Sequence, residues 1–508
     1  MKNLLPYSFL SLLVSTNFIP NILHTQSNNW GAFENHMDIG NIKNQGAAAY
    51  NPIDQSYTLT GSGVNMWAEQ DEFQFLWRPI QGDFILRAQV AFIGDGVDPH
   101  RKIGWMIRNS FSPKSPYVDA AIHGDGLTSL QYRKTEGAET LQIESTDKAP
   151  DIVQLERRGN TYIMSTAKYG EPLTHVQTTD VTLRNEVFVG LFICSHNPEV
   201  IERAVFSNVR IIKPAKPDFR PYRDYIGSNL EIMEVATGKR KILMQSAHSL
   251  QAPNWTPDGK TLIYNSNGFL YNYDLASGAV TMLNTGFATR NNNDHVLTFD
   301  GKTMGISHHN ADDNGTSSIY YLPVTGSDNP IKVTKNGVGA SYFHGWSPDG
   351  EYMVFTANRK DKFDIYKVSI KDKKEIQLTD NEFLDDGPEY SPDGQYIYFN
   401  STRTGMMQLW RMKADGSEEE QLTFDKNYND WFPHFSPDGK TIIFISYGTD
   451  VTPTDHPFYK HCVLRSMPAA GGTPTIIAYL YGGQGSINVP GWSPDGKYIA
   501  FVSNSDMD

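Results

Sequence analysis

The chain has 508 residues, too many for one ordinary hydrophobic core, so its length predicts two or three domains. Hydrophobic residues make up 39% of it, enough for buried cores, and a formal net charge of -13 argues against non-specific binding to nucleic acid or anionic membranes. The only two cysteines, Cys194 and Cys462, fall in different predicted domains, so neither a disulfide framework nor a thiolate metal cluster is expected.

The N-terminus combines a positive charge at Lys2 with a short apolar run over residues 4–14, which is typical of a secretory signal peptide. The run is too short to span a bilayer, and no later segment is long and apolar enough to do so. A hydrophobic N-terminal strand is the alternative interpretation. We expect residues 1–27 to be the signal peptide, which places the protein in the periplasm or outside the cell.

Residues 28–213 are expected to form an all-β sandwich. From Phe84 to Phe92 every second residue is apolar, as in a half-buried strand, and other short strand candidates follow at regular spacing. This region is similar to concanavalin-like (laminin-G-like) jelly rolls, which occur beside bacterial carbohydrate-active modules. The resemblance rests on the strand pattern together with Gly-Asp-Phe at 82–84 and Lys-Ile-Gly-Trp-Met-Ile-Arg at 102–108.

One stretch of this domain alternates polar and apolar residues around a His-Gly-Asp-Gly sequence at 123–126. Aromatic rings pack on the apolar face of a sugar and polar side chains bond its hydroxyls, so we expect a carbohydrate-binding face. A solvated outer face without a ligand is the alternative. The candidate residues are Trp105, Asp119, His123, Asp125, Gln131 and Arg133.

Residues 214–228 are interpreted as a linker. Pro214, Pro217 and Pro221 lie close together there, and such a density of proline favours an extended, semi-rigid connection.

From residue 229 to 508 one phrase recurs: a bulky residue, then Ser or Thr, usually Pro, then Asp-Gly and a short apolar strand. Proline presets the first turn position, aspartate bonds nearby backbone and glycine accepts a positive φ, so each copy predicts a tight hairpin turn. The copies are spaced 42, 49, 44, 45 and 57 residues apart, near the period of propeller blades. The turn aspartates are Asp258, Asp300, Asp349, Asp393, Asp438 and Asp495.

The order of the hairpins predicts how the ring closes. The region begins with a lone outer hairpin at 229–245 and ends with a lone inner hairpin at 489–503. Together they would complete one blade, and such closure removes exposed strand edges. The expected fold is therefore all-β: an N-terminal two-sheet jelly-roll sandwich, then a six-bladed β-propeller closed by a shared 2+2 blade.

These repeats resemble the WD40-like blades of TolB-type six-bladed propellers, and similar blades occur in prolyl-oligopeptidase-like peptidases. The resemblance covers residues 229–508 and implies a fold rather than a function, because such propellers have many unrelated roles. The chain contains no Gly-x-Ser-x-Gly nucleophile elbow, so serine peptidase activity is not expected. The predicted sandwich stands where the TolB family has a small α/β domain.

Aligning the blades on the turn aspartate places ionisable side chains at the mouth of the propeller tunnel. Imidazoles beside a carboxylate suit a divalent transition metal, or act as acid and base near neutral pH. The arrangement is reminiscent of oligogalacturonate lyases, propellers with a His-rich metal centre. The alternative is that the histidines only hydrogen-bond the channel wall. The candidate residues are His295, His344, Asp386, Glu389, His434 and Asn488.

The sequence thus predicts a secreted or periplasmic binding or scaffold protein that recognises a carbohydrate or an envelope protein through the propeller mouth and the sandwich face. No catalytic residue is assigned, and no cofactor is expected unless a divalent metal binds at the mouth. Two alternatives stay open: a metal-assisted, lyase-like enzyme acting on polysaccharide at the mouth, and a Tol-system-like envelope scaffold.

Overall fold

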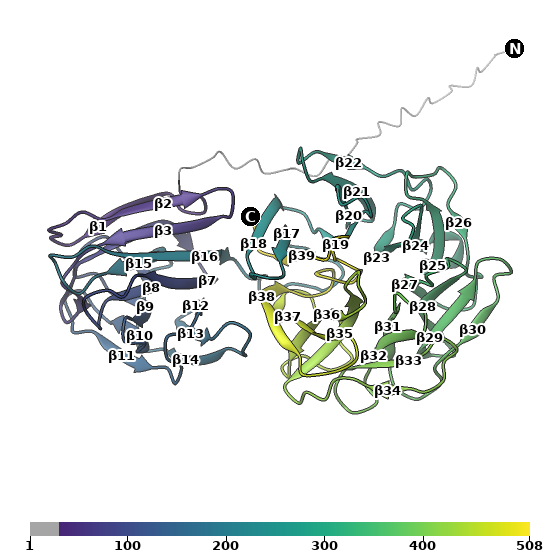
Figure 1. The fold of residues 1–508 in the computed structure, drawn as a ribbon. Coiled ribbons are helices and arrows are strands. Elements are labelled where there is room, and N and C mark those ends of the chain that lie inside the picture. Colours follow the sequence, from purple (N-terminus) through teal and green to yellow (C-terminus); the bar gives the residue numbers. More distant parts are fainter. Residues whose placement is uncertain (1–29, 508) are drawn as a thin grey trace, which may run out of the picture.

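The computed structural model describes residues 30–507, so the predicted signal peptide lies outside the described residues. Apart from the 3-10 helix Ala311–Asp313, every element in this range is a β-strand. The strands form two lobes, a sandwich made by the first part of the chain and a propeller made by the rest (Figure 1). No helix within residues 30–507 has the length and apolarity needed to cross a membrane.

The N-terminal lobe consists of two seven-stranded sheets. The first runs β1 (Asn35–Ile39), β6 (Phe73–Gln81), β15 (Glu186–Cys194), β8 (Lys102–Arg108), β9 (Tyr117–His123), β10 (Thr128–Arg133) and β11 (Leu141–Glu144). The second runs β14 (Thr174–Thr178), β13 (Thr161–Ala167), β12 (Ile152–Arg158), β7 (Phe84–Ile93), β16 (Glu202–Ile212), β3 (Ser56–Gly61) and β2 (Ala47–Asn51). A small hairpin, β4 (Met66–Trp67) and β5 (Gln70–Asp71), lies apart from both.

The core of this lobe follows from the two-residue period of its strands. Phe84 and Leu86 on β7 point inward from one sheet, and Trp105 and Ile107 on β8 point inward from the other, all into one buried cluster. Because successive side chains alternate between faces, the residues between them point away from the core. On β7 these outward residues, Ile85 and Arg87 among them, meet the propeller.

The propeller consists of six antiparallel sheets within residues 228–504. Five of them have four strands each. The first two blades are β19 (Gln251–Trp255), β20 (Thr261–Ser266), β21 (Phe269–Asp274) and β22 (Val280–Met282), and then β23 (Asn291–Leu297), β24 (Thr303–Asn310), β25 (Thr316–Pro323) and β26 (Ile331–Lys332). The next three blades are β27 (Ser341–Trp346), β28 (Tyr352–Arg359), β29 (Lys362–Ser369) and β30 (Glu375–Gln377); β31 (Asp385–Tyr390), β32 (Tyr396–Ser401), β33 (Gln408–Lys413) and β34 (Glu420–Gln421); and β35 (Tyr428–Phe435), β36 (Thr441–Gly448), β37 (Lys460–Pro468) and β38 (Thr475–Gly482).

The sixth sheet joins the two ends of the propeller. β17 (Ser228–Glu234) pairs with β18 (Arg240–Ser246) on one side and with β39 (Tyr498–Asn504) on the other. Where a fourth, innermost strand was expected, Trp492 makes only an isolated bridge to Ile499.

The recurring phrase makes the turn that its residue types predict. In the third copy the Ser347 hydroxyl donates to Asp349 Oδ1 at 2.5 Å and accepts from the Tyr352 N–H at 2.9 Å. Asp349 also accepts from the Glu351 N–H at 2.9 Å, and Gly350 has φ +73°. These bonds fix the hairpin between the first two strands of the blade, and with it the path of the strand that leads to the tunnel.

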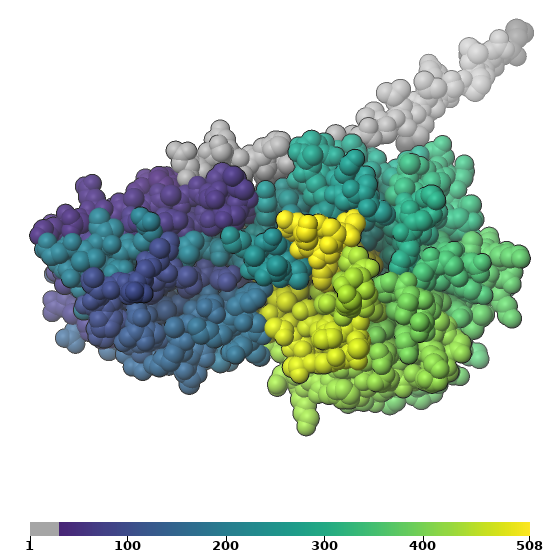
Figure 2. Space-filling view, viewed as in Figure 1, coloured from purple at the N-terminus to yellow at the C-terminus, as the bar shows by residue number. Residues whose placement is uncertain are grey.

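The two lobes share a continuous apolar interface. Ile85 and Ile212 of the sandwich pack with Phe458 and Tyr481 of the propeller in one buried cluster. A second cluster brings Ile152 against blade residues of β37 and β38. The space-filling view shows the blue sandwich pressed directly against the yellow-green end of the propeller (Figure 2). The lobes therefore form one packed body.

Candidate functional site: the propeller mouth

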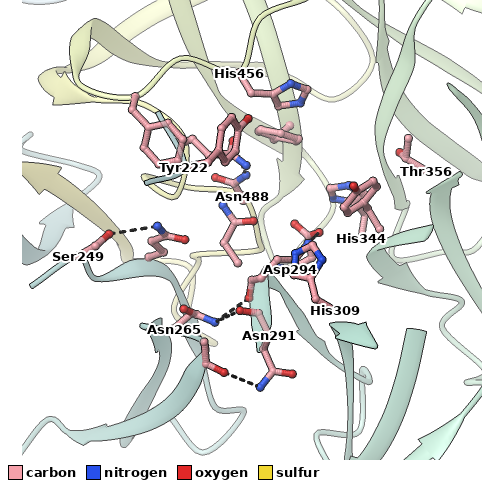
Figure 3. Close-up of a pocket in the computed structure, with 18 of the residues that line it drawn as sticks. Tyr222, Ser249, Asn265, Asn291, Asp294, His309, His344, Thr356, His456 and Asn488 are labelled. Carbon is pink, nitrogen blue, oxygen red and sulfur yellow. Dashed lines mark hydrogen bonds between the residues drawn. The ribbon is translucent and has the colours of Figure 1, made fainter. Parts of the chain in front are cut away.

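A cavity of about 950 Å³ lies at the mouth of the propeller (Figure 3). Volumes of this order hold small molecules or short peptide segments. Its walls come from the first strands of five blades, β19, β23, β27, β31 and β35, from ends of neighbouring strands, from several loops, and from the segment that links the two lobes. The blades thus provide a rigid base and the loops provide the rim.

Asp386 on β31 is the centre of the polar network in this cavity. Its Oδ2 accepts a hydrogen bond from His456 Nε2 at 2.8 Å, and its Oδ1 accepts one from the Thr356 hydroxyl at 2.7 Å. His344 Nε2 lies 3.4 Å from the same Oδ1. Burial alone would raise the pKa of Asp386, but the bonds from His344 and His456 outweigh it and hold the pKa well below its usual range.

His344 stands between two carboxyl groups. Burial alone would lower its pKa, but the negative charges of Asp294 and Asp386 outweigh burial and raise it above the ordinary value. Asp294 accepts from the Asn292 amide at 2.6 Å, and burial raises its pKa. The network therefore favours an imidazolium at His344 beside an ionised Asp386.

Side-chain amides dominate the rest of the wall. Each offers both a donor and an acceptor, the pairing that hydroxyl groups and peptide units need. Some are committed to the protein: Asn265 donates to the carbonyls of Asn291 and Asn292 at 3.1 and 2.7 Å. The eight that line the cavity are Gln251, Asn265, Asn267, Asn291, Asn292, Asn293, Gln484 and Asn488.

Aromatic residues form the rim. Tyr222 and Tyr225, from the segment between the lobes, contact Phe458 with ring centroids 5.0 and 5.8 Å apart. Both tyrosines are exposed, at 64% and 43%. Deeper in, Phe432 stacks on His344 at 5.7 Å. A ligand entering the mouth therefore passes apolar rings before it reaches the amides and the charged network.

Of the six mouth residues predicted from the sequence, His344, Asp386 and Asn488 line the cavity. The structure places the other three outside the lining of this cavity. His295 is buried, and its Nε2 donates to the Ile263 carbonyl at 3.2 Å. His434 contacts Glu389 (Nδ1 to Oε2, 2.6 Å) and the Ile487 carbonyl (Nε2, 3.0 Å), so this pair is part of the channel wall.

The innermost strands of all five four-stranded blades are irregular. The pairing register shifts between Asn291 and His295, between Asp386 and Glu389, and between Trp431 and His434. A β-bulge re-aims the side chains that follow it, so residues on its far side no longer share the face that counting by two predicts. Alignment on the turn aspartate cannot detect such a shift.

Sequence reasoning missed several residues of the network. His456 lies in the long loop between β36 and β37, outside the repeat, and Thr356 lies on a second strand. Asp294 belongs to the Asn-Asn-Asn-Asp run, whose composition also suits an ordinary turn. The signal for His456 was the extra length of the last repeat interval, because long loops on propellers often carry function. Within residues 30–507 no three His, Cys, Asp or Glu side chains converge as a metal ion requires.

The second predicted site, on the sandwich, is divided between two faces. Trp105 points into the core, whereas Asp119 and Gln131 point to the opposite face of the same sheet and are buried there. Arg133 lies on that face too and forms a two-bond ion pair with Asp71 at 2.7 and 2.9 Å.

Of the remaining sandwich candidates, His123 is buried and Asp125 is exposed. Strand alternation alone prevents Trp105 and Asp119 from forming one sugar-binding surface.

Comparisons with known proteins match the propeller. The profile of the PD40 family, described as a TolB beta propeller domain, matches residues 313–454. An uncharacterised protein of Agrobacterium fabrum is 46% identical over 276 residues, which span 54% of this chain and 92% of that protein. The structure of a putative TolB from Agrobacterium tumefaciens is 45% identical, covers 55% of this chain and 99% of its own, and has a TM-score of 0.52. TolB from Acinetobacter baumannii is 18% identical, with 51% and 64% covered and a TM-score of 0.40.

Proposed function

Because this chain belongs, through its propeller, to the TolB β-propeller family, we propose that it is a periplasmic binding and scaffold protein of the cell envelope. In this proposal the propeller mouth receives a segment of an envelope protein partner. The N-terminal sandwich, which we propose to be a jelly roll, packs against the propeller and extends its surface.

One observation carries the proposal: the mouth holds a preformed cavity with an organised polar base and an exposed aromatic rim. Exposed aromatic residues are enriched at recognition sites, because they bury much apolar area and lose little side-chain entropy. The amides below them satisfy the backbone N–H and C=O groups of an inserted segment. His344 and Asp386 supply a charged pair that orients it.

A carbohydrate is the second candidate for the same cavity. The eight amides and the rings of Tyr222 and Phe432 have the chemistry that binds a neutral, polyhydroxylated molecule. The comparisons give this ligand no support of their own, and neither the lyase-like enzyme nor the Tol-like role is better supported than a general envelope scaffold.

The test is site-specific photo-crosslinking in cells that carry the full-length protein. A photo-reactive phenylalanine replaces Tyr222 at the rim, and in a matched control it replaces Phe424, an exposed aromatic residue of the propeller outside the cavity. We expect a defined adduct from position 222 that is absent from position 424 and is lost when Asp386→Asn is added.

The adduct is then identified, and the partner is purified and titrated against the wild-type protein and the Asp386→Asn variant by calorimetry. Binding weakened at least tenfold by the substitution supports the proposal. Equal adducts at both positions, or binding that ignores Asp386, would contradict it. Binding of neutral oligosaccharides with the same dependence on Asp386, and no protein adduct, would favour the carbohydrate.

A further inference from the structure

The interface between the sandwich and the propeller contains five buried charged side chains, which we call the interface charge cluster: Arg87, Glu156, Arg210, Glu231 and Arg240. Each is at most 5% exposed. A charge in such a place is costly unless an opposite charge compensates it. The pairing within the cluster therefore decides what else the interface must hold.

Glu231 is doubly paired. Arg210 from the sandwich reaches its Oε2 at 2.5 Å, and Arg240 on the neighbouring strand reaches its Oε1 at 2.8 Å. Glu156 is paired differently, with Arg158 at 2.5 Å and with His461 at 3.2 Å, both of which are partly exposed. Both carboxylates of the cluster are thus already committed.

Arg87 has no carboxylate partner among the described residues. Its Nε and Nη2 both donate to Gln154 Oε1, at 2.9 and 2.7 Å, and its Nη1 makes no hydrogen bond within residues 30–507. Burial first, and then the neighbouring Arg240, lower its pKa to about 10, so it stays protonated at neutral pH. Because Glu156 is paired with Arg158, and Glu231 with Arg210 and Arg240, the positive charge of Arg87 is left in excess, without a paired carboxylate.

A small cavity of about 20 Å³ lies between Arg87 and Arg240. It has room for one water molecule or one monatomic ion and is too small for a polyatomic anion. Ala88, Ile152 and Ala478 make part of its wall apolar. The Tyr169 and Tyr479 hydroxyls on the same wall already donate to the carbonyls of Ile477 and Glu171.

From this arrangement we propose that a single small monovalent anion, chloride under cellular conditions, binds in the cavity between Arg87 and Arg240. It balances the excess charge of the cluster and accepts from the free Nη1 of Arg87. Because the cavity is bounded by β7 of the sandwich and by β18 and β38 of the propeller, the ion links the two lobes. This site is independent of the propeller mouth.

The test compares thermal unfolding of the full-length protein in sodium chloride and in sodium gluconate at the same ionic strength. Gluconate is too large for the cavity. A ligand that binds only the folded state raises Tm with its concentration, so we expect Tm to be about 2–4 °C higher in 150 mM chloride than in gluconate and to saturate. Fluoride or bromide should raise Tm as chloride does, whereas sulfate should not.

Arg87→Gln should remove the difference between the two salts. The control is Arg157→Gln, another buried arginine of the sandwich, which donates to backbone carbonyls and should keep the chloride effect despite any loss of stability. Should Arg87→Gln fail to fold, anomalous diffraction from crystals of the wild-type protein soaked in bromide decides the question by a peak beside Arg87 Nη1. Equal Tm values in chloride and gluconate, or an empty anomalous map, would mean that the cavity holds water only and would overturn the proposal.

Discussion

The carboxylate of Asp386 holds the polar network of the mouth together, because it contacts His344, Thr356 and His456. Asp386→Asn keeps the shape of this side chain and removes its charge. We expect the pKa of His344 to fall, since one of the two carboxyl groups that raise it is lost. An NMR titration of the ring protons measures this. An unchanged pKa of His344 in the variant would contradict the proposed network.

Glu231 should make the free energy of unfolding depend on acid pH. Burial would raise its pKa, but Arg210 and Arg240 outweigh burial and lower it from 4.5 to about 2 in the folded protein. A depressed pKa contributes stability above pH 4.5 that is lost as the pH falls toward 2. The shift corresponds to about 3 kcal/mol, of which about 2 kcal/mol should be lost by pH 3.

Urea denaturation of the Glu231→Gln variant checks this contribution. At pH 7 the variant should be less stable than the wild type by about 3–5 kcal/mol, because two buried guanidinium groups lose their partner. The gap should narrow by about 2 kcal/mol at pH 3. The control is Glu382→Gln at an exposed site, which should leave the free energy of unfolding unchanged at both pH 7 and pH 3. If the difference in free energy of unfolding between the wild type and the variant stays constant with pH, Glu231 is not the cause of the acid dependence.

At the scale of elements, the turn phrase offers an internal comparison, because its second copy has Phe299 where the others have proline. The hydrogen bonds are the same: the Thr298 hydroxyl donates to Asp300 at 2.7 Å, and the Gly301 N–H donates to the Thr298 carbonyl at 2.8 Å. A proline that fits an existing turn stabilises by restricting the unfolded chain.

We therefore expect Phe299→Pro to raise the free energy of unfolding by about 0.4–1 kcal/mol. Chemical denaturation at 25 °C measures the change. Phe299→Ala is the control, because it also removes the half-exposed ring without restricting φ. If the proline variant were no more stable than the alanine variant, the turn would not have the geometry of the other copies.

The strands and turns also show which features of the fold and of the site can be predicted from the sequence alone. The six hairpin turns were predictable, because Pro, Asp and Gly act within a few residues of one another. The positions of His295 and His434 were not, since each follows a register shift that depends on pairing with the next strand. The same limit applies to His456, which reaches Asp386 from a loop seventy residues further along the chain.

For the whole molecule, closure of the ring depends on β39, which pairs with β17 from Ser228 opposite Asn504 to Glu234 opposite Tyr498. A chain that ends at Lys497 lacks this strand and exposes the edge of β17. We expect it to lose cooperative unfolding and to self-associate, because an unpaired edge is a template for pairing with another chain. Circular dichroism melts and light scattering would reveal both. A chain ending at Asp506 should behave as the wild type, and a monomeric, cooperative Lys497 chain would mean that closure is not needed.

The segment between the lobes does more than tether them. Phe219 packs on Tyr459 at 4.9 Å, the Ile226 N–H donates to the Tyr459 hydroxyl at 3.1 Å, and Tyr222 and Tyr225 stand in the wall of the mouth. The six blades alone therefore do not form the complete binding cavity. A related protein with the same six blades but a different segment at residues 219–225 should have the same fold and a different ligand selectivity.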